Sequence, residues 1–97
     1  MKISTGQRPG DYPYDSYDEL HRVLVLLVRS RIDQTLVVQE TADPTRAKPG
    51  THDFATSVLA RLCRAIETVE DVLELPLFER AALEETIAKR YEDGLDP

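Results

Sequence analysis

The apolar positions of this chain recur at the spacing of an α-helix, most clearly between residues 51 and 74. Because side chains three and four positions apart share one face of a helix, this period predicts a helix over residues 52–74, with Thr51 as its N-cap. One broad stripe of that helix is expected to be core. It consists of Phe54, Val58, Leu62, Ile66, Val69, Val72 and Leu73, with Leu59 and Ala65 at its edges.

A longer and more evenly apolar segment precedes this helix. Neither glycine nor proline occurs between Tyr17 and Ala42, and residues 16–19 have the pattern of a capping box in which Ser16 precedes the first helical turn. These signals predict a helix over residues 16–42, about 39 Å long at 1.5 Å per residue. The many β-branched residues leave two strands as an alternative, but no turn signal divides the segment.

Prolines and glycines mark where these helices end. Residues 43–50 hold two prolines and a glycine and are expected to reverse the chain. Pro76 suits the first position of a third helix over residues 76–93, which stops at Gly94. The apolar face of that helix is expected to comprise Leu77, Ala81, Leu83, Ile87, Ala88 and Tyr91.

Together these elements describe one all-α domain over residues 16–94. Its expected architecture is an antiparallel hairpin of two long helices with a third, shorter helix packed across it. Residues 1–15, which contain glycines and prolines, are expected to form an extended or disordered arm, and residues 95–97 a short tail. At 97 residues the chain fits one domain and buries a marginal core.

The helix predicted over residues 16–42 carries more apolar residues than a hairpin partner and one short helix cover. The candidate interaction surface consists of Val25, Leu26, Ile32, Leu36 and Val37. An uncovered apolar face is typical of a protein–protein interface. We therefore expect the first helix to pack against its own copy, so that a homodimer forms a helical bundle, with an unidentified protein as the alternative partner.

Composition and charge narrow the partners and the location. Apolar residues make up 41% of the chain and charged residues 31%, which is typical of a globular helical protein. The formal charge of −6 opposes binding to phosphate backbones, so direct contact with DNA or RNA is not expected. The longest apolar run, residues 23–28, is too short to span a membrane. The single cysteine and the polar N-terminus favour a cytoplasmic protein.

Acidic residues gather in the second half of the helix predicted over residues 52–74. The candidate acidic patch consists of Glu67, Glu70, Asp71 and Glu74. These acids stand at the negative end of the helix dipole. An antiparallel hairpin would place Arg22, Arg29 and Arg31 beside them, and we expect these arginines to balance their charge. A continuous acidic strip would instead favour a mimic of nucleic acid that blocks a basic cleft on another protein.

One acidic pattern partly resembles an enzyme family. Glu67-x-x-Glu70 is similar to the acidic pairs of the all-α nucleotide pyrophosphohydrolases, which hold Mg²⁺ between facing helices. The resemblance implies a second pair in the third helix, where no Glu-x-x-Asp occurs. The acids available there are Glu84, Glu85, Glu92 and Asp93. Residues 26–31 are superficially similar to the first helix of the helical chorismate mutases, but no later lysine follows in the same helix.

No further pattern points to catalysis. The glycines are isolated, so no phosphate-binding loop is present, and His21 and His52 have no second ligand at metal-binding spacing. Cys63 lies on the polar side of its predicted helix, next to Arg64. It is expected to be partly exposed and without a chemical role, with a reactive thiol as the alternative. The sequence therefore favours a non-enzymatic interaction or regulatory module, with no catalytic residue, metal or cofactor.

Overall fold

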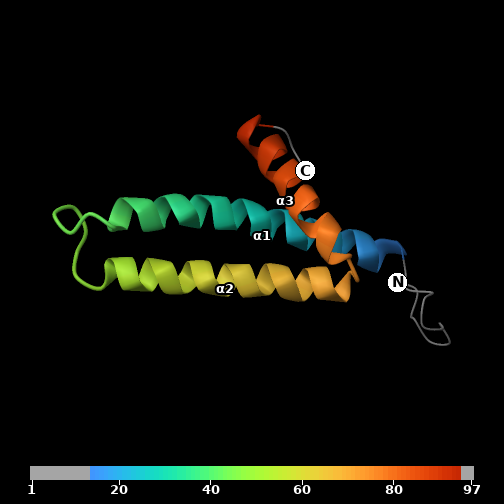
Figure 1. The fold of residues 1–97 in the computed structure, drawn as a ribbon, viewed down its shortest axis with the longest axis horizontal. Helices are drawn as coiled ribbons and strands as arrows, with labels where there is room; N and C mark the ends of the chain where they lie inside the picture. The colour runs from blue at the N-terminus through green and yellow to red at the C-terminus, as the bar shows by residue number, and fades with distance from the viewer. Residues whose placement is uncertain (1–13, 95–97) are drawn as a thin grey trace.

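Three α-helices make up the computed structural model, which describes residues 14–94. They are α1 (Tyr14–Thr41), α2 (Thr51–Val72) and α3 (Leu77–Glu92) (Figure 1). No β-strand occurs among the described residues. The all-α prediction is therefore confirmed, and the two-strand alternative for the first apolar segment is wrong.

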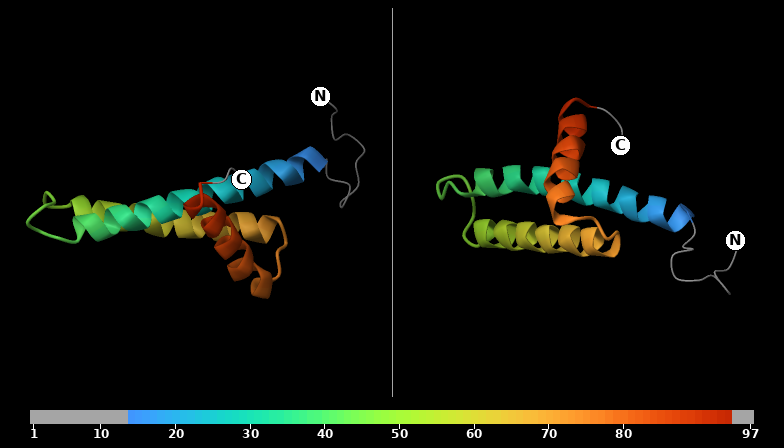
Figure 2. Two further views of the ribbon diagram at one scale, coloured as in Figure 1. Left: turned by 90° about the horizontal axis from the view of Figure 1, so that it is seen from above. Right: turned by 45° about the vertical axis from the view of Figure 1, so that its right-hand side comes forward.

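The first two helices form a hairpin. They lie side by side and run in opposite directions, joined by residues 42–50 (Figure 1; Figure 2). α3 leaves the end of α2 and crosses α1 at a steep angle (Figure 2). It contacts α1 far more than α2, and the contacts between α1 and α2 outnumber both. The molecule is elongated as a result, with extents of 59 × 28 × 27 Å.

The start of α1 differs from the prediction. The first helical residue is Tyr14, so Ser16 lies inside the helix and the prediction that it precedes the first turn is wrong. The nearest helix-breaking residue before Tyr17 in the sequence is Pro13, and residues 14–16 contain nothing that stops a helix. The rest of the predicted arm, residues 1–13, and the predicted tail, residues 95–97, lie outside the described residues.

The loop between α1 and α2 is defined at both ends by local contacts. The Asp43 carboxylate accepts hydrogen bonds from the backbone N–H and the hydroxyl of Thr45, at 2.9 and 2.7 Å, and so closes an Asx turn just after α1. Gly50 has a φ of +85°, a left-handed conformation that favours glycine, and directly precedes α2. Thr51 is thus the first residue of α2 and not its N-cap.

A Schellman turn joins α2 to α3. The N–H of Leu75 donates to the carbonyl of Glu70 at 3.1 Å, and the N–H of Glu74 donates to the carbonyl of Asp71 at 3.0 Å. Glu74 takes the left-handed position of this turn, with a φ of +57°, where glycine is the usual residue. Pro76 follows in an extended conformation and precedes α3 instead of being its first residue.

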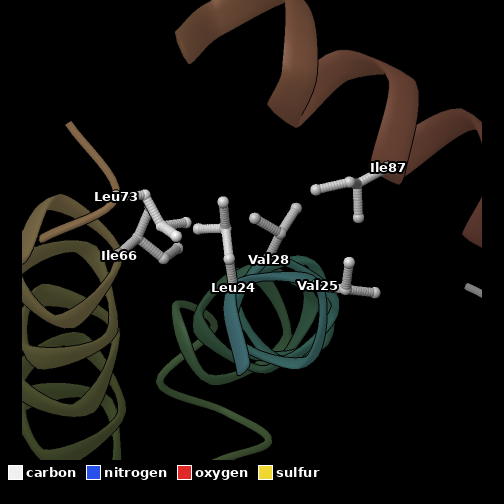
Figure 3. Close-up of a cluster of buried hydrophobic side chains, with 6 residues drawn as sticks. All are labelled: Leu24, Val25, Val28, Ile66, Leu73 and Ile87. Atoms are coloured by element: carbon white, nitrogen blue, oxygen red, sulfur yellow. The ribbon is translucent and has the colours of Figure 1, made fainter. Parts of the chain in front are cut away.

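The core lies where the three helices meet (Figure 3). Its buried apolar side chains are Leu24, Val25 and Val28 of α1, Ile66 of α2, Leu73 directly after α2, and Ile87 of α3. Leu24 points toward α2, whereas Val25 lies beside Ile87 (Figure 3). Burial of one such side chain contributes roughly 1.5–3 kcal/mol. α3 contributes Ile87 to this buried cluster, and its partly buried Leu83 packs against the cluster, so the docking of α3 rests on few apolar side chains.

Some residues of the predicted apolar stripes are exposed. Phe54 is 72% exposed and Val72 59%, so their assignment to the core is wrong, and Leu77 on the predicted apolar face of α3 is 80% exposed. The reason is the position of α3, which packs on α1 and leaves one side of α2 uncovered. Ile66 and Leu73, on the side of α2 that faces α1, are buried as predicted.

Candidate functional site

A cluster of charged side chains occupies the point where the three helices approach one another. At its centre is Glu70 of α2, which is only 2% exposed. It lies there because it follows Ile66 by four residues and precedes Leu73 by three, so it stands on the buried stripe of α2. An ionised carboxylate in such a position carries a large desolvation penalty unless it is paired.

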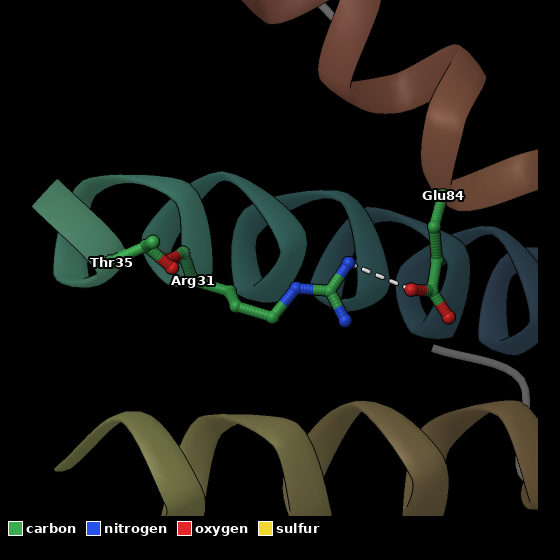
Figure 4. A network of polar contacts seen from close by, with 3 residues as sticks. All are labelled: Arg31, Thr35 and Glu84. Carbon is green, nitrogen blue, oxygen red and sulfur yellow. Dashed lines mark hydrogen bonds and ion pairs between the residues drawn. The ribbon is translucent and has the colours of Figure 1, made fainter. Parts of the chain in front are cut away.

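Two arginines reach this cluster, and each is matched to a carboxylate other than Glu70. Arg31 extends from α1 and places its Nη2 atom 2.7 Å from Oε1 of Glu84 on α3 (Figure 4). Arg80 of α3 places its Nη1 atom 2.8 Å from Oδ1 of Asp71 on α2. The Nε–H of Arg80 also donates to the carbonyl of Leu75 at 2.9 Å, which fixes the guanidinium beside the turn.

The carboxyl groups of Glu70 and Glu84 are neighbours, and each affects the pKa of the other through a side-chain hydrogen bond. Burial, together with this bond and the charge of Glu84, raises the pKa of Glu70 to about 7, although Arg80 and Arg31 oppose the shift. Burial alone would raise the pKa of Glu84 as well, but the hydrogen bonds from Glu70 and Arg31 lower it on balance. The second oxygen of Glu70, Oε2, is buried and has no hydrogen-bond partner.

The count of charges explains this division. Three carboxylates and two arginines gather here, and the arginines pair with Glu84 and Asp71. If Glu70 carries a proton, the cluster is neutral and its O–H donates to Glu84. If Glu70 is ionised, one buried negative charge is left without a cation of its own. The arrangement therefore favours a state in which Glu70 and Glu84 share one proton.

Divalent metal binding is the chemistry of the partly resembling hydrolases, and there it uses carboxylates from facing helices that converge on one ion. Within residues 14–94 no group of three or more His, Cys, Asp or Glu side chains is placed to hold a metal ion. Glu67, the first residue of the Glu67-x-x-Glu70 pattern, is exposed while Glu70 is buried. Among the acidic residues of α3, Glu84 lies next to Glu70, whereas Glu85 and Glu92 are exposed.

The candidate acidic patch is not one surface. Glu67 and Glu74 are exposed, Asp71 is exposed but paired with Arg80, and Glu70 is buried. We expected three arginines of α1 to balance the acids of α2. Of these, only Arg31 reaches the charged cluster around Glu70. Two other arginines of α1 are engaged elsewhere: Arg22 pairs with Glu19 in the same helix, and the Arg29 guanidinium lies 4.5 Å from the centre of the Tyr91 ring on α3.

The candidate interaction surface is divided in a similar way. Val25 is buried under α3 at 6% exposure, so its place on an exposed face is wrong. Ile32 is half-buried and packs against the core. Leu26, Leu36 and Val37 are exposed, at 57%, 52% and 40%.

Periodicity shows which side of the hairpin these exposed residues occupy. At about 100° per residue, Leu26 and Val37 lie about 160° and 180° around α1 from Val28, which is buried in the core. On α2, Phe54 and Val72 lie about 160° from Glu70, which meets α3. Both sets therefore point away from α3. We call the surface formed by Val23, Leu26, Val37, Phe54 and Val72 the hairpin face.

The remaining candidate residues have ordinary surroundings. His52 contacts the Thr41 hydroxyl through Nδ1 at 3.1 Å and so ties the end of α1 to the start of α2. Cys63 is a free, exposed thiol on α2. None of the helices in the described part of the chain is long and apolar enough to cross a membrane.

No family model, no curated protein and no solved structure matches the chain.

Proposed function

We propose that this protein is a non-enzymatic interaction module that self-associates through the hairpin face. The observation that carries the proposal is the alignment of exposed apolar side chains from two neighbouring helices on the side opposite α3. Large apolar residues gathered in this way are typical of interfaces and are unfavourable in water. A second copy that presents the same face would cover them and complete a bundle of four long helices.

The size of the hairpin face suits a stable dimer. α2 has 22 residues and is the shorter helix of the hairpin, so the shared length is about 33 Å at 1.5 Å per residue. Two adjacent helices, each about 10 Å wide, then offer roughly 660 Å² per copy. Two copies would bury about 1,300 Å², which falls within the roughly 1,200–2,000 Å² of specific protein interfaces.

The test is the mass of the full chain in solution, measured by light scattering over a range of concentrations. We expect twice the 11.0 kDa mass of the chain. Phe54 and Phe78 form a matched pair, because they are 72% and 82% exposed but only Phe54 belongs to the hairpin face. Phe54→Lys should shift the mass toward one chain by burying an unpaired charge in the interface, and Phe78→Lys should leave it unchanged.

A mass of one chain at every concentration would contradict the proposal. Equal effects of Phe54→Lys and Phe78→Lys would also contradict it, because association would then not use the hairpin face.

A further inference from the structure

α3 is attached to α1 by a small set of contacts. They surround the carboxyl cluster, by which we mean Glu70, Glu84 and Asp71 with their arginines Arg31 and Arg80. Ile87 packs against the buried residues of α1 (Figure 3), and Glu84 pairs with Arg31 (Figure 4). At the far end of α3, the Tyr91 hydroxyl donates to the Asp33 carboxylate at 2.8 Å. The α2 side of the hairpin meets α3 at Glu70 with Glu84 and at the ion pair of Asp71 with Arg80.

We propose that α3 is a proton-dependent cover of α1, docked while Glu70 and Glu84 share one proton and released from α1 when that proton is lost. This inference does not rest on self-association, because the hairpin face lies on the opposite side of the hairpin.

The groups that face Glu70 come from all three helices. Arg31 approaches from α1, and Glu84 and Arg80 approach from α3. On α2 the neighbouring acids are Asp71, which is paired with Arg80, and the exposed Glu67 and Glu74. Both arginines are already paired with carboxylates, so an ionised Glu70 leaves the cluster with a net negative charge that the two arginines offset only in part.

Movement of α3 is the simplest relief of that charge. Glu70 is carried by the hairpin, whose two helices share most of the contacts between elements, whereas Glu84 is carried by α3, which contacts α2 only weakly. Separation of α3 from the hairpin therefore moves two like charges apart and lets water reach Glu70. The pKa of Glu70, raised to about 7 by burial first and by Glu84 second, sets the proton loss near neutral pH.

Release of α3 would change the surface of α1. Val25 and Val28, now buried against Ile87, would become accessible. At about 100° per residue they share one side of α1 with Ile32 and Leu36, the half-buried and exposed members of the candidate interaction surface. Proton loss would thus complete a second apolar strip on α1, separate from the hairpin face.

The experiment measures the distance between α2 and α3 in the full chain by electron paramagnetic resonance. One spin label is attached to Cys63, which is free and exposed. The other is attached to Glu92→Cys, an exposed position at the end of α3. An excess of unlabelled chain removes distances between copies. At about pH 5.5 we expect one narrow distance, and at about pH 8.5 a broader and longer distribution, with the released fraction rising about tenfold or more.

Two variants and one direct titration make the test decisive. Glu70→Gln keeps the shape and a hydrogen-bond donor but cannot ionise, so its distance should stay narrow at both pH values. Glu67→Gln removes the same charge from an exposed position and should behave like the parent. The Glu70 carboxyl carbon, followed by nuclear magnetic resonance in the unsubstituted chain, should titrate near 7.

Three results would overturn the inference. The first is an identical distance distribution of the parent chain at both pH values. The second is broadening of Glu70→Gln to the same extent as the parent. The third is titration of Glu70 near its ordinary value of 4.5, and this measurement stands even if the Glu70→Gln variant fails to fold.

Discussion

Arg31 of α1 and Glu84 of α3 form an ion pair of 2.7 Å at the place where the buried Glu70 of α2 also arrives. Three helices are therefore joined through one charged contact. The positive charge of Arg31 compensates the Glu84 carboxylate directly. It also reduces the electrostatic repulsion between Glu70 and Glu84. The pair is mostly shielded from water, with side-chain exposures of 28% and 20%.

Loss of Arg31 should be costly. Arg31→Met keeps much of the apolar stem but leaves Glu84 and Glu70 without that cation, and we expect the free energy of unfolding at neutral pH to fall by about 2–3 kcal/mol. Urea denaturation followed by circular dichroism measures this change. Arg22→Met is the matched control, since Arg22 pairs with Glu19 at the surface and its loss should cost less than about 0.5 kcal/mol. Equal costs would show that the buried pair has no special role.

Stability should depend on pH in a direction that Glu70 determines. The pKa of Glu70 is raised from 4.5 to about 7 in the folded chain, so the folded state binds more protons than the unfolded state between these values. The stabilisation is complete below about pH 4.5 and is lost as the pH rises to about 7. Glu84, whose pKa is lowered, acts in the opposite sense, and its contribution is lost as the pH falls below its ordinary value of 4.5.

The melting temperature should therefore be highest near pH 5 and fall toward pH 8. The Glu70→Gln variant isolates the contribution of Glu70 to this pH dependence. Relative to the parent, its free energy of unfolding should rise by roughly 2–3 kcal/mol between pH 5 and pH 8. Glu67→Gln provides the comparison for a surface acid. A constant difference between Glu70→Gln and the parent from pH 5 to 8 would mean that Glu70 titrates normally.

Glu74 offers a stabilising substitution. It has a φ of +57° in the Schellman turn after α2, a conformation that costs a residue with a Cβ atom more than it costs glycine. We expect Glu74→Gly to raise the free energy of unfolding by about 1 kcal/mol, with thermal melting as the measurement. Glu67→Gly, inside α2, should instead destabilise by about 1 kcal/mol. Destabilisation by Glu74→Gly would argue against the turn as described.

Leu24 and Leu26 are near neighbours in α1 with opposite roles. Leu24 is fully buried, and Leu24→Ala should cost about 2–5 kcal/mol because it leaves a cavity between α1 and α2. Leu26 belongs to the hairpin face, so Leu26→Ala should cost little in a dilute sample and more as concentration rises and the face is covered. Melting curves at two concentrations separate the two effects, and a large cost for Leu26 that is independent of concentration would place it in the core.

The boundaries of the helices could be predicted from the sequence because they depend on neighbouring residues. Asp43 and Gly50 act within the loop, and Gly94 ends α3 with its own left-handed conformation. The start of α1 was wrong by two residues, since a capping pattern at Ser16 was given more weight than the absence of any helix breaker before it.

The carboxyl cluster was missed although its signal was present. Glu70 lies on the same stripe as Ile66 and Leu73, and an acid on a core stripe indicates a buried carboxyl that needs a partner. Charge alone does not distinguish Glu70 from Glu67 and Asp71. Their positions around the helix do, because only Glu70 lies on the core stripe.

The packing of α3 on α1 could not be read from local patterns. It depends on the direction in which the turn after Leu73 sends the chain, and no apolar period within α3 contains that information. The consequence extends to Phe54 and Val72, which stay exposed because no third helix covers their side of α2.

The weak attachment of α3 also has a consequence for cooperativity. α1 and α2 share an extended seam, whereas α3 adds Ile87, Leu83 and a few polar contacts. Under native conditions a segment held in this way opens at a lower free energy than the rest of the chain. Backbone amide protons of α3 should exchange with solvent ahead of those at the centre of the seam, and the protein would unfold in two steps, first α3 and then the hairpin.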